Sequence, residues 1–526
     1  MAGAKSVGID PGAALTLNRT EREGVIAMPG DDGGLDELAS AIADADRGGS
    51  LNGAANALAQ LAADGAELDK VMPVLSSVRP RTWLRLDTAL RKVWHPSYRW
   101  RQIIESTWRR SDSVALLLTA CSGDGRQRQR AVKSRSMRGD QRLLPLLLIR
   151  AADWAEPVRV DATAALPAVL AVADPDALIA ATGVAMAMRD WHRGGHAVAA
   201  VTEALRTRTD GTLDAARMSG DIHVRRLAYR VWLDQAHLDS TAVVEAAQTE
   251  RDNVCQSLCV EAVVRSSIRR RRWDTLERLL GARFTRVRAE ALAGLVQIGR
   301  PEAGEPVLAD RSATVRATAQ WAMRRAGRDA AARYRELLFS VDDAHLRGVV
   351  AGLGECGTND DVQLVCCYLE HDRPRVRAEA VRTVRRLGGP LDRISGMLTD
   401  PSPNVVRAVL AALRGQPDLP PTDLLWKLLR AEQPPHVRRA AFSLLVSRDT
   451  WTRIEADLQG VVDVDDKLRA HASTDLSGWL DREASTAYQL PHPSTLDRLG
   501  SLIDAAEPTI GIHEAHLLRW HLGLSD

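Results

Sequence analysis

Arginine recurs at a near-constant step along this 526-residue chain. From Arg288 onward the intervals between successive arginines of the series are 28, 31, 30, 30, 31 and 31 residues. Every member follows a valine or a leucine, and the series comprises Arg159, Arg225, Arg288, Arg316, Arg347, Arg377, Arg407, Arg438 and Arg469. A fixed period of about 20–50 residues is typical of a solenoid, in which each unit buries its apolar face only against its neighbours.

Residues 371–400 show the repeating unit. The tripeptide Asp372-Arg373-Pro374 precedes an apolar stripe with helical spacing over 376–387. Gly388-Gly389-Pro390 ends that helix, and a second, shorter stripe follows over 391–398. Each repeat is therefore predicted to be two antiparallel helices. The predicted fold class is all-α, an α-solenoid built as a superhelical stack of antiparallel helix pairs.

The repeat resembles the HEAT repeat, in which a loop aspartate follows an apolar helix and the next helix begins Val-Arg-x-x-Ala. The matches run from Asp310 to Val315-Arg316-Ala317, from Asp372 to Val376-Arg377-Ala378, and from Asp400 to Val406-Arg407-Ala408. The resemblance is specific over 280–480 and weaker over 100–280, where Val254-Cys255-Gln256 keeps the spacing and loses the arginine. The period is shorter than the usual HEAT length of about 40–47 residues. It is similar to the short HEAT-like repeats of the bilin-lyase type.

The aspartates and arginines of these repeats have a structural interpretation. A loop aspartate can cap the second helix and complement its dipole. The resemblance implies that each arginine reaches the aspartate of its own or the adjacent repeat. We predict this structural ladder at Asp310, Arg316, Asp372, Arg377, Asp400 and Arg407.

The two ends of the chain differ from the middle. Residues 1–34 lack a sustained apolar period, which predicts a flexible acidic tail. We expect N-terminal helical repeats over 35–150, the HEAT-like array over 151–482, and a pair of capping helices over 483–526, because a solenoid needs a cap with one polar face.

Composition argues against several classes of protein. The six cysteines lie in apolar helical patterns without the C-x-x-C spacing of a zinc site, and no stretch approaches 18 apolar residues. His513-Glu514-Ala515-His516 lacks the H-E-x-x-H spacing of a zinc protease. We expect a cytoplasmic protein with buried thiols, no catalytic residues, no metal, no cofactor and no membrane contact.

Charge is unevenly placed along the chain. Residues 1–75 contain 5 basic and 12 acidic side chains, whereas residues 76–150 contain 17 basic and 5 acidic ones. We call residues 79–138 the basic segment. Guanidinium groups neutralise phosphates and indoles stack on unpaired bases. The candidate binding residues of the basic segment are Arg79, Arg81, Trp83, Arg85, Arg91, Lys92, Trp94, Arg99, Trp100, Arg101, Trp108, Arg109, Arg126, Arg128 and Arg130.

Two hypotheses about function follow. The first is a non-catalytic scaffold that binds a partner protein along its helical surface. The second is a nucleic-acid-binding protein that uses the basic segment. A structural alternative also remains open for that segment, in which its tryptophans fill helix interfaces and its arginines form a solvated face. The sequence leaves the partner and the oligomeric state undefined.

Overall fold

The computed structural model describes residues 33–93, 113–236, 241–416 and 418–524. The prediction of an all-α solenoid is confirmed, because the described residues form helices joined by short loops and contain no strand. A single isolated bridge joins Glu67 to Ser113. None of the described helices is long and apolar enough to cross a membrane. The predicted tail lies almost entirely outside the described residues.

The chain divides into two compact units, residues 1–235 and 236–526. This boundary falls inside the predicted 151–482 array, where no break in composition marked it. The helices of unit 1 are α1 (Gly33–Asp46), α2 (Asn52–Ala63), α3 (Leu68–Ser76), α4 (Pro80–Val93), α6 (Val114–Ala120), α7 (Gly125–Lys133), α8 (Arg135–Gly139), η1 (Gln141–Leu143), α9 (Leu144–Ala151), α10 (Glu156–Val172), α11 (Pro175–Ala187), α12 (Gly195–Thr207), α13 (Thr212–Arg217) and α14 (Ile222–Gln235).

Unit 2 contains the regular part of the arginine series. Its helices are α15 (Thr241–Thr249), α16 (Asn253–Arg270), α17 (Trp273–Leu280), α18 (Thr285–Gln297), η2 (Pro301–Val307), α19 (Ala313–Arg325), α20 (Ala330–Leu337), α21 (Asp343–Cys356), η3 (Asn359–Asp361), α22 (Val362–Cys366), α23 (Pro374–Arg386), α24 (Leu391–Ser395), η4 (Gly396–Thr399), α25 (Pro403–Leu413), α26 (Thr422–Leu429), α27 (Pro435–Leu445), α28 (Thr450–Val461), α29 (Asp466–Arg482), η5 (Ala484–Thr486), α30 (Pro493–Ile510) and α31 (Ile512–His521).

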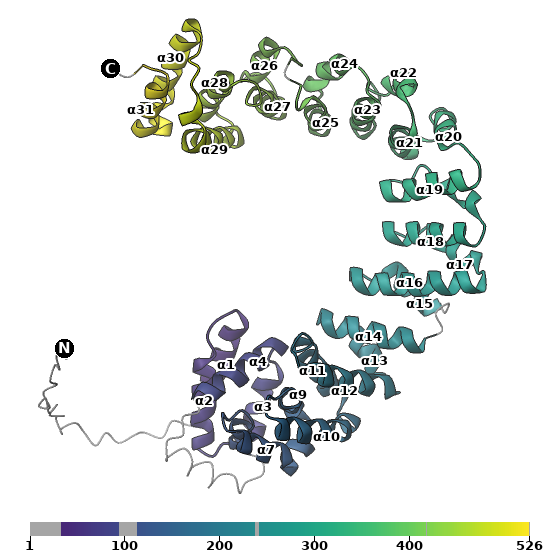
Figure 1. Ribbon diagram of the computed structural model, residues 1–526, viewed down its shortest axis with the longest axis vertical. Helices are drawn as coiled ribbons and strands as arrows, with labels where there is room; N and C mark the ends of the chain where they lie inside the picture. Colours follow the sequence, from purple (N-terminus) through teal and green to yellow (C-terminus); the bar gives the residue numbers. More distant parts are fainter. Residues whose placement is uncertain (1–32, 94–112, 237–240, 417, 525–526) are drawn as a thin grey trace, which may run out of the picture. The chain divides into compact units, whose positions relative to one another are not determined.

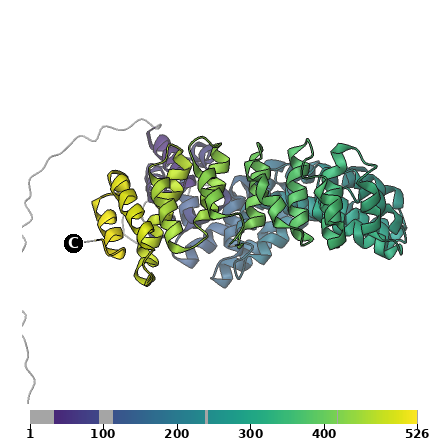
Figure 2. The ribbon, with the colours of Figure 1, turned by 90° about the horizontal axis from the view of Figure 1, so that it is seen from above.

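Within unit 2 the helices that carry the Val-Arg motif lie side by side in one layer. Helix α18 packs on α19, α21 on α23, α23 on α25, and α25 on α27. The shorter helices between them, such as α20, α22, α24 and α26, form the second layer (Figure 1). Figure 2 shows the yellow and green helices of this unit from above, side by side in a row. We call the first set the motif layer.

The core of unit 2 follows the predicted apolar stripes. Val376, Val381 and Val384 of α23 are buried, and so are Ile394 and Leu398 in the return segment. The return segment is only partly α-helical, because α24 ends at Ser395 and continues as the 3-10 helix η4. A short second helix is enough to bury two leucine-sized side chains per repeat, which explains why the period is near 31 residues rather than about 40.

Candidate functional site

The arginine of the motif layer ties one repeat to the next. Arg288, near the start of α18, is buried and donates Nε and Nη2 to the carboxylate of Asp310 at 2.8 Å each. Its Nη1 donates to the carbonyls of Ala282 and Arg283 in the loop before its own helix, at 2.8 and 2.9 Å. Asp310 also accepts from the backbone N–H of Ser312, at 2.8 Å, where α19 begins. The Arg288 guanidinium therefore holds the loop before α18 and, through Asp310, the start of α19.

The same bond set recurs at Arg377, three repeats further along the chain. Arg377 donates to the Asp400 carboxylate at 2.8 and 2.9 Å and to the carbonyls of His371 and Asp372 at 2.8 and 3.0 Å. The hydrogen bonds that Arg377 donates to Asp400 raise the pKa of its guanidinium. Asp400 accepts from the N–H of Ser402, at 2.7 Å. The predicted partnership thus runs to the aspartate of the next repeat, with both charges largely enclosed.

The ladder has two corrections of detail. The carboxylate of Asp372 caps no helix, because the N-cap position of α23 is Arg373, which has no side-chain cap, and Arg377 uses only the Asp372 carbonyl. Arg316 reaches only the carbonyl of Asp310, at 2.8 Å, and pairs instead with Glu355 of α21. Arg347 likewise pairs with Glu379 of α23, at 3.4 Å. For Arg316 and Arg347, a glutamate on the next motif helix replaces a loop aspartate as the partner.

Arg407 departs from the ladder altogether. It is exposed on α25 and donates to Asn404 Oδ1 at 2.8 Å, with no ion pair among the described residues. In intact steps such as Arg288, Arg377 and Arg438 the partner aspartate lies 22 to 25 residues further along the chain. Glu432 lies 25 residues after Arg407 but forms no ion pair with it, so the ladder is broken at this repeat.

The middle of the motif layer borders a groove of about 1140 Å³. Its lining comes mainly from the first turns of α18, α19, α21, α23 and α25 and from the loops that precede them. Eight arginines and one histidine face four carboxylates. The N-terminal ends of helices also carry partial positive charge. We call this the first groove, and its electrostatic character is basic.

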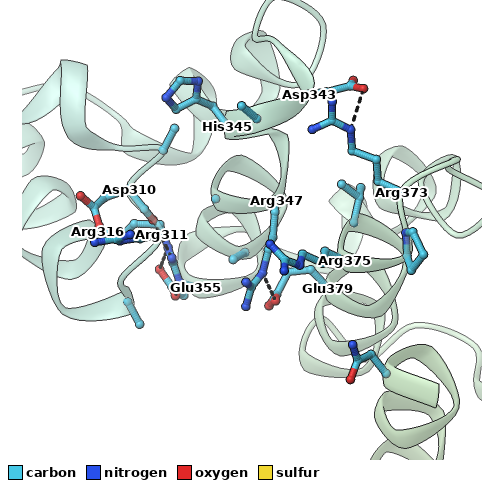
Figure 3. A pocket seen from close by; sticks show the side chains of 18 of the residues that line it. Asp310, Arg311, Arg316, Asp343, His345, Arg347, Glu355, Arg373, Arg375 and Glu379 are labelled. Carbon is cyan, nitrogen blue, oxygen red and sulfur yellow. Dashed lines mark hydrogen bonds and ion pairs between the residues drawn. The ribbon is translucent and has the colours of Figure 1, made fainter. Parts of the chain in front are cut away.

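Half of the arginines in the first groove are engaged with carboxylates. Figure 3 shows three ion pairs that cross from one element to the next: Arg316 with Glu355, Arg347 with Glu379, and Arg373 with Asp343. Arg288 is held by Asp310 as described above. Within the described chain, no ion pair joins the exposed side chains of Arg283, Arg311, Arg375 and Arg386.

A close helix contact forms the floor of the first groove. An ideal Cβ at Gly348 of α21 would lie 2.0 Å from the carbonyl oxygen of Ala309, a distance that no side chain can adopt. Glu355 is steadied by Gln320, whose Nε2 donates to Oε2 at 2.9 Å. Buried Tyr334 donates to the carbonyl of Leu308 at 2.8 Å. The arginines of the first groove that make no ion pair among the described residues therefore lie over closely packed helices.

A second groove of about 820 Å³ adjoins the first at the start of α25. Ser402 and Asn404 line the first groove, whereas Pro403 and Arg407 line the second. Helices α25, α27 and α29 supply its walls. Its exposed arginines without an ion pair among the described residues are Arg407, Arg414 and Arg482.

The ladder and its supporting helix pairs agree with a family comparison. A family model for HEAT repeats matches residues 364–446, which run from α22 to α27. Residues 364–446 are HEAT repeats. The sequence resemblance to that family is thereby confirmed, and the matched HEAT repeats contain the ladder pair Arg377–Asp400 and the break at Arg407.

Solved structures resemble the chain at low similarity. A chain from a structure of Kap95p with RanGDP is 15% identical, with a TM-score of 0.32, covering 93% of this chain and 72% of that one. Yeast importin-beta, Kap95p, is 13% identical, with a TM-score of 0.27 and coverage of 93% and 67%. An engineered protein is 15% identical, with a TM-score of 0.19 and coverage of 69% and 97%. TM-scores this low carry no information on partner or activity. No match was found among curated protein sequences.

The basic segment is only partly available as a surface. Trp83 is 3% exposed in the core of unit 1 and Arg128 is fully buried, so their assignment as binding residues is wrong. Arg91 pairs with Asp87 at 3.0 Å, and Arg85 donates to the carbonyl of Ala45 at 3.0 Å. Of the candidate binding residues, those that are described and exposed are Arg79, Arg81, Arg85, Lys92, Arg126 and Arg130. The calls on Trp94, Arg99, Trp100, Arg101, Trp108 and Arg109 lie outside the described residues, and nucleic-acid binding there stays a prediction.

Arg128 proves to be a ladder arginine. Its Nε and Nη2 donate to Asp153 at 2.8 and 2.7 Å, and its Nη1 donates to the carbonyls of Ser122 and Gly123 at 2.8 and 2.9 Å. Arg150, also fully buried, adds a bond to Asp153 at 3.0 Å and pairs with Asp87. Burial by itself raises the pKa of Asp153. The hydrogen bonds donated by Arg128 and the positive charge of Arg150 outweigh burial and hold this pKa below its ordinary value. We call these four residues the buried network.

One sequence signal could have identified Arg128. It lies 31 residues before Arg159, which is the period of the series, but glutamine rather than valine precedes it. Spacing also corrects the apparent loss at Cys255. Gln256 lies 31 residues after Arg225 and donates to the Glu250 carbonyl at 3.1 Å, six residues back, as Arg288 and Arg377 do. A glutamine thus fills the ladder position there.

A buried carboxyl group lies at the far end of the array. Asp457 of α28 is fully buried, and neither of its oxygens accepts a hydrogen bond. Burial, reinforced by the negative charge of Asp475, raises the pKa of Asp457 to about 9. Asp475 itself is held by Arg453 at 2.7 and 3.0 Å. Asp457 is therefore a neutral acid near pH 7, able to donate its proton to Asp475.

The cysteines and histidines give a mixed result. None of the six cysteines forms a disulfide; four are buried, Cys356 is half-buried and Cys367 is exposed, so the expectation of buried thiols is wrong at Cys367. Among the residues that the structure describes, no group of three or more His, Cys, Asp or Glu side chains could hold a metal ion.

Proposed function

We propose that this chain is a non-catalytic HEAT-repeat scaffold that binds a partner protein along its helical surface. The observation that carries the proposal is the first groove, where exposed arginines without carboxylate partners project beside a ladder that uses the same residue type for structure. An exposed guanidinium with no internal partner is free to bind another molecule, and arginine is enriched at protein interfaces.

The framework favours a rigid binding surface. Each ladder arginine fixes the loop before its own helix and the start of the next, so the groove is shaped before a partner arrives. A surface that is already ordered loses little conformational entropy on binding. A cytoplasmic location is part of the proposal. It agrees with the finding that none of the six cysteines forms a disulfide.

Photo-crosslinking tests this proposal. A benzoylphenylalanine residue in place of Ala313 or Ala344, two exposed alanines of the first groove, should capture the same protein from cells. The matched control is the same residue in place of Gln363, which is exposed on α22 outside both grooves. Equal capture from all three positions, or no capture from the groove, would contradict the proposal.

A further inference from the structure

We infer that the two grooves form one continuous track for an extended acidic segment of a partner protein, with Arg375, Arg386 and Arg407 as its principal contacts. This inference rests on the proposed function and adds the chemistry of the partner. The grooves adjoin at α25, where neighbouring residues 402–404 line one or the other.

The break in the ladder at Arg407 supports the continuity. In an intact ladder step such as Arg377, the guanidinium donates its hydrogen bonds to the aspartate of the next repeat and to loop carbonyls. Arg407 makes no ion pair among the described residues, and its side chain is left exposed in the lining of the second groove. The break in the ladder therefore leaves an unpaired positive charge on the track at the point where the two grooves adjoin.

The spacing of the repeats sets the length of the occupant. Helices pack about 8–10 Å apart. The track crosses the motif layer from α18 to α29, which is six such steps, so it is on the order of 55 Å long. An extended chain advances about 3.3 Å per residue, so roughly 15–17 residues would fill it. One repeat then corresponds to about three residues, which favours acidic side chains at every third position.

The lining favours a peptide over a nucleic acid. The first groove carries four carboxylates, from Asp310, Asp343, Glu355 and Glu379, between its arginines. A polynucleotide places a phosphate at every step and would meet these charges, whereas a peptide can present glutamates only opposite the unpaired arginines. Neither groove offers an exposed Trp, Tyr or Phe ring for base stacking, since Phe442 is the only such residue in the two linings and it is buried.

The test uses the full chain and a fluorescein-labelled 15-residue peptide with glutamate at every third position and glycine and serine elsewhere. Fluorescence anisotropy should show binding that weakens as salt rises, because the charges attract across solvent. The counterpart with glutamine in place of glutamate should bind at least tenfold more weakly. The triple variant Arg375→Glu/Arg386→Glu/Arg407→Glu should also lose at least tenfold in affinity for the glutamate peptide.

A matched control separates the track from general charge. Arg269→Glu/Arg278→Glu/Arg393→Glu makes the same charge change at exposed sites of unit 2 outside both grooves, and it should bind the peptide within about twofold of wild type. Equal loss in both triple variants would overturn the inference. So would tighter binding of a 15-nucleotide single-stranded DNA through the same three arginines. The glutamate peptide could fail to bind while crosslinking from Ala313 and Ala344 still captures one protein. That result would overturn the inference of an acidic segment and leave the proposed scaffold function supported.

Discussion

Unit 1 and unit 2 place arginine in contrasting surroundings. In the buried network of unit 1, Arg128 and Arg150 are fully buried and share the carboxylate of Asp153. In unit 2 the ladder pairs lie just beneath a groove whose other arginines are exposed. A guanidinium enclosed with a carboxylate contributes to stability, whereas one left at the surface costs little to change and is available to a partner. The same residue at the same period can therefore serve either purpose, depending on the carboxylate one repeat away.

The largest effect is expected in the buried network. Asp153→Ala leaves two buried guanidinium groups without their shared carboxylate, which should lower the free energy of unfolding by about 3–5 kcal/mol. Urea-induced unfolding followed by circular dichroism measures it. Glu203→Ala is the control, because Glu203 pairs at 2.7 Å with Arg206 on the exposed face of α12 and should change stability by less than about 1 kcal/mol. Similar losses in the two variants would remove the distinction between buried and surface pairs.

Asp457 is the opposite case, a buried carboxyl group with a carboxylate rather than an arginine beside it. Its pKa of about 9 in the folded chain exceeds the ordinary value of 3.8. Because the unfolded chain loses this proton at lower pH, its contribution to stability is full below about pH 4 and falls as pH rises toward 9, by at most about 1.4 kcal/mol per unit.

Asp457→Asn cannot ionise and keeps a donor toward Asp475. Relative to wild type it should gain on the order of 2–3 kcal/mol in unfolding free energy between pH 5 and pH 8. Chemical denaturation of both proteins across this range tests the prediction. Parallel pH profiles for the two proteins would show that Asp457 ionises normally.

The ladder itself should give an intermediate effect. Arg377→Ala removes a bidentate ion pair and two bonds to loop carbonyls and should destabilise by about 1–3 kcal/mol. Arg407→Ala, at the equivalent position one repeat later, should change the unfolding free energy by less than about 0.5 kcal/mol. Thermal or urea denaturation distinguishes them, and equal losses would mean that the ladder is unbroken at Arg407.

The smallest effect is expected for the exposed arginines of the first groove. Arg375→Ala and Arg386→Ala remove side chains that make no ion pair among the described residues, so each should change unfolding free energy by less than about 0.5 kcal/mol. The same denaturation experiment measures this. A loss above about 1 kcal/mol for either variant would assign that arginine to the structural set instead.

The sequence predicted the repeats better than the use of their side chains. Period and apolar stripes were sufficient for the helix pairs, because each repeat buries its apolar face only against its neighbours. They could not show that Arg316 turns from the Asp310 carboxylate to Glu355, since that choice depends on the distance between two helices. Trp83 and Arg128 were grouped with surface residues because charge counted along the chain does not reveal which side of a helix is enclosed.

The groove was beyond sequence reasoning for a related reason. Arg375 and Arg386 fall between members of the arginine series and look like any other solvated charges. Only the stacking of α18 to α25 brings them to one surface with the helix starts. The missing partner of Arg407 could not be predicted from the sequence either, because Glu432 lies 25 residues after it, the spacing of the Arg438–Asp463 pair, and yet forms no ion pair with it.

A double-mutant cycle tests most directly whether ladder arginines act through the carboxylate of the next repeat. The single variants Arg377→Ala and Asp400→Ala are compared with the double variant in urea denaturation, and Arg407→Ala with Asn404→Ala forms the reference cycle. We predict a coupling energy of about 1–3 kcal/mol for Arg377 with Asp400 and one within about 0.5 kcal/mol of zero for the reference. Coupling near zero for Arg377 with Asp400 would contradict the account.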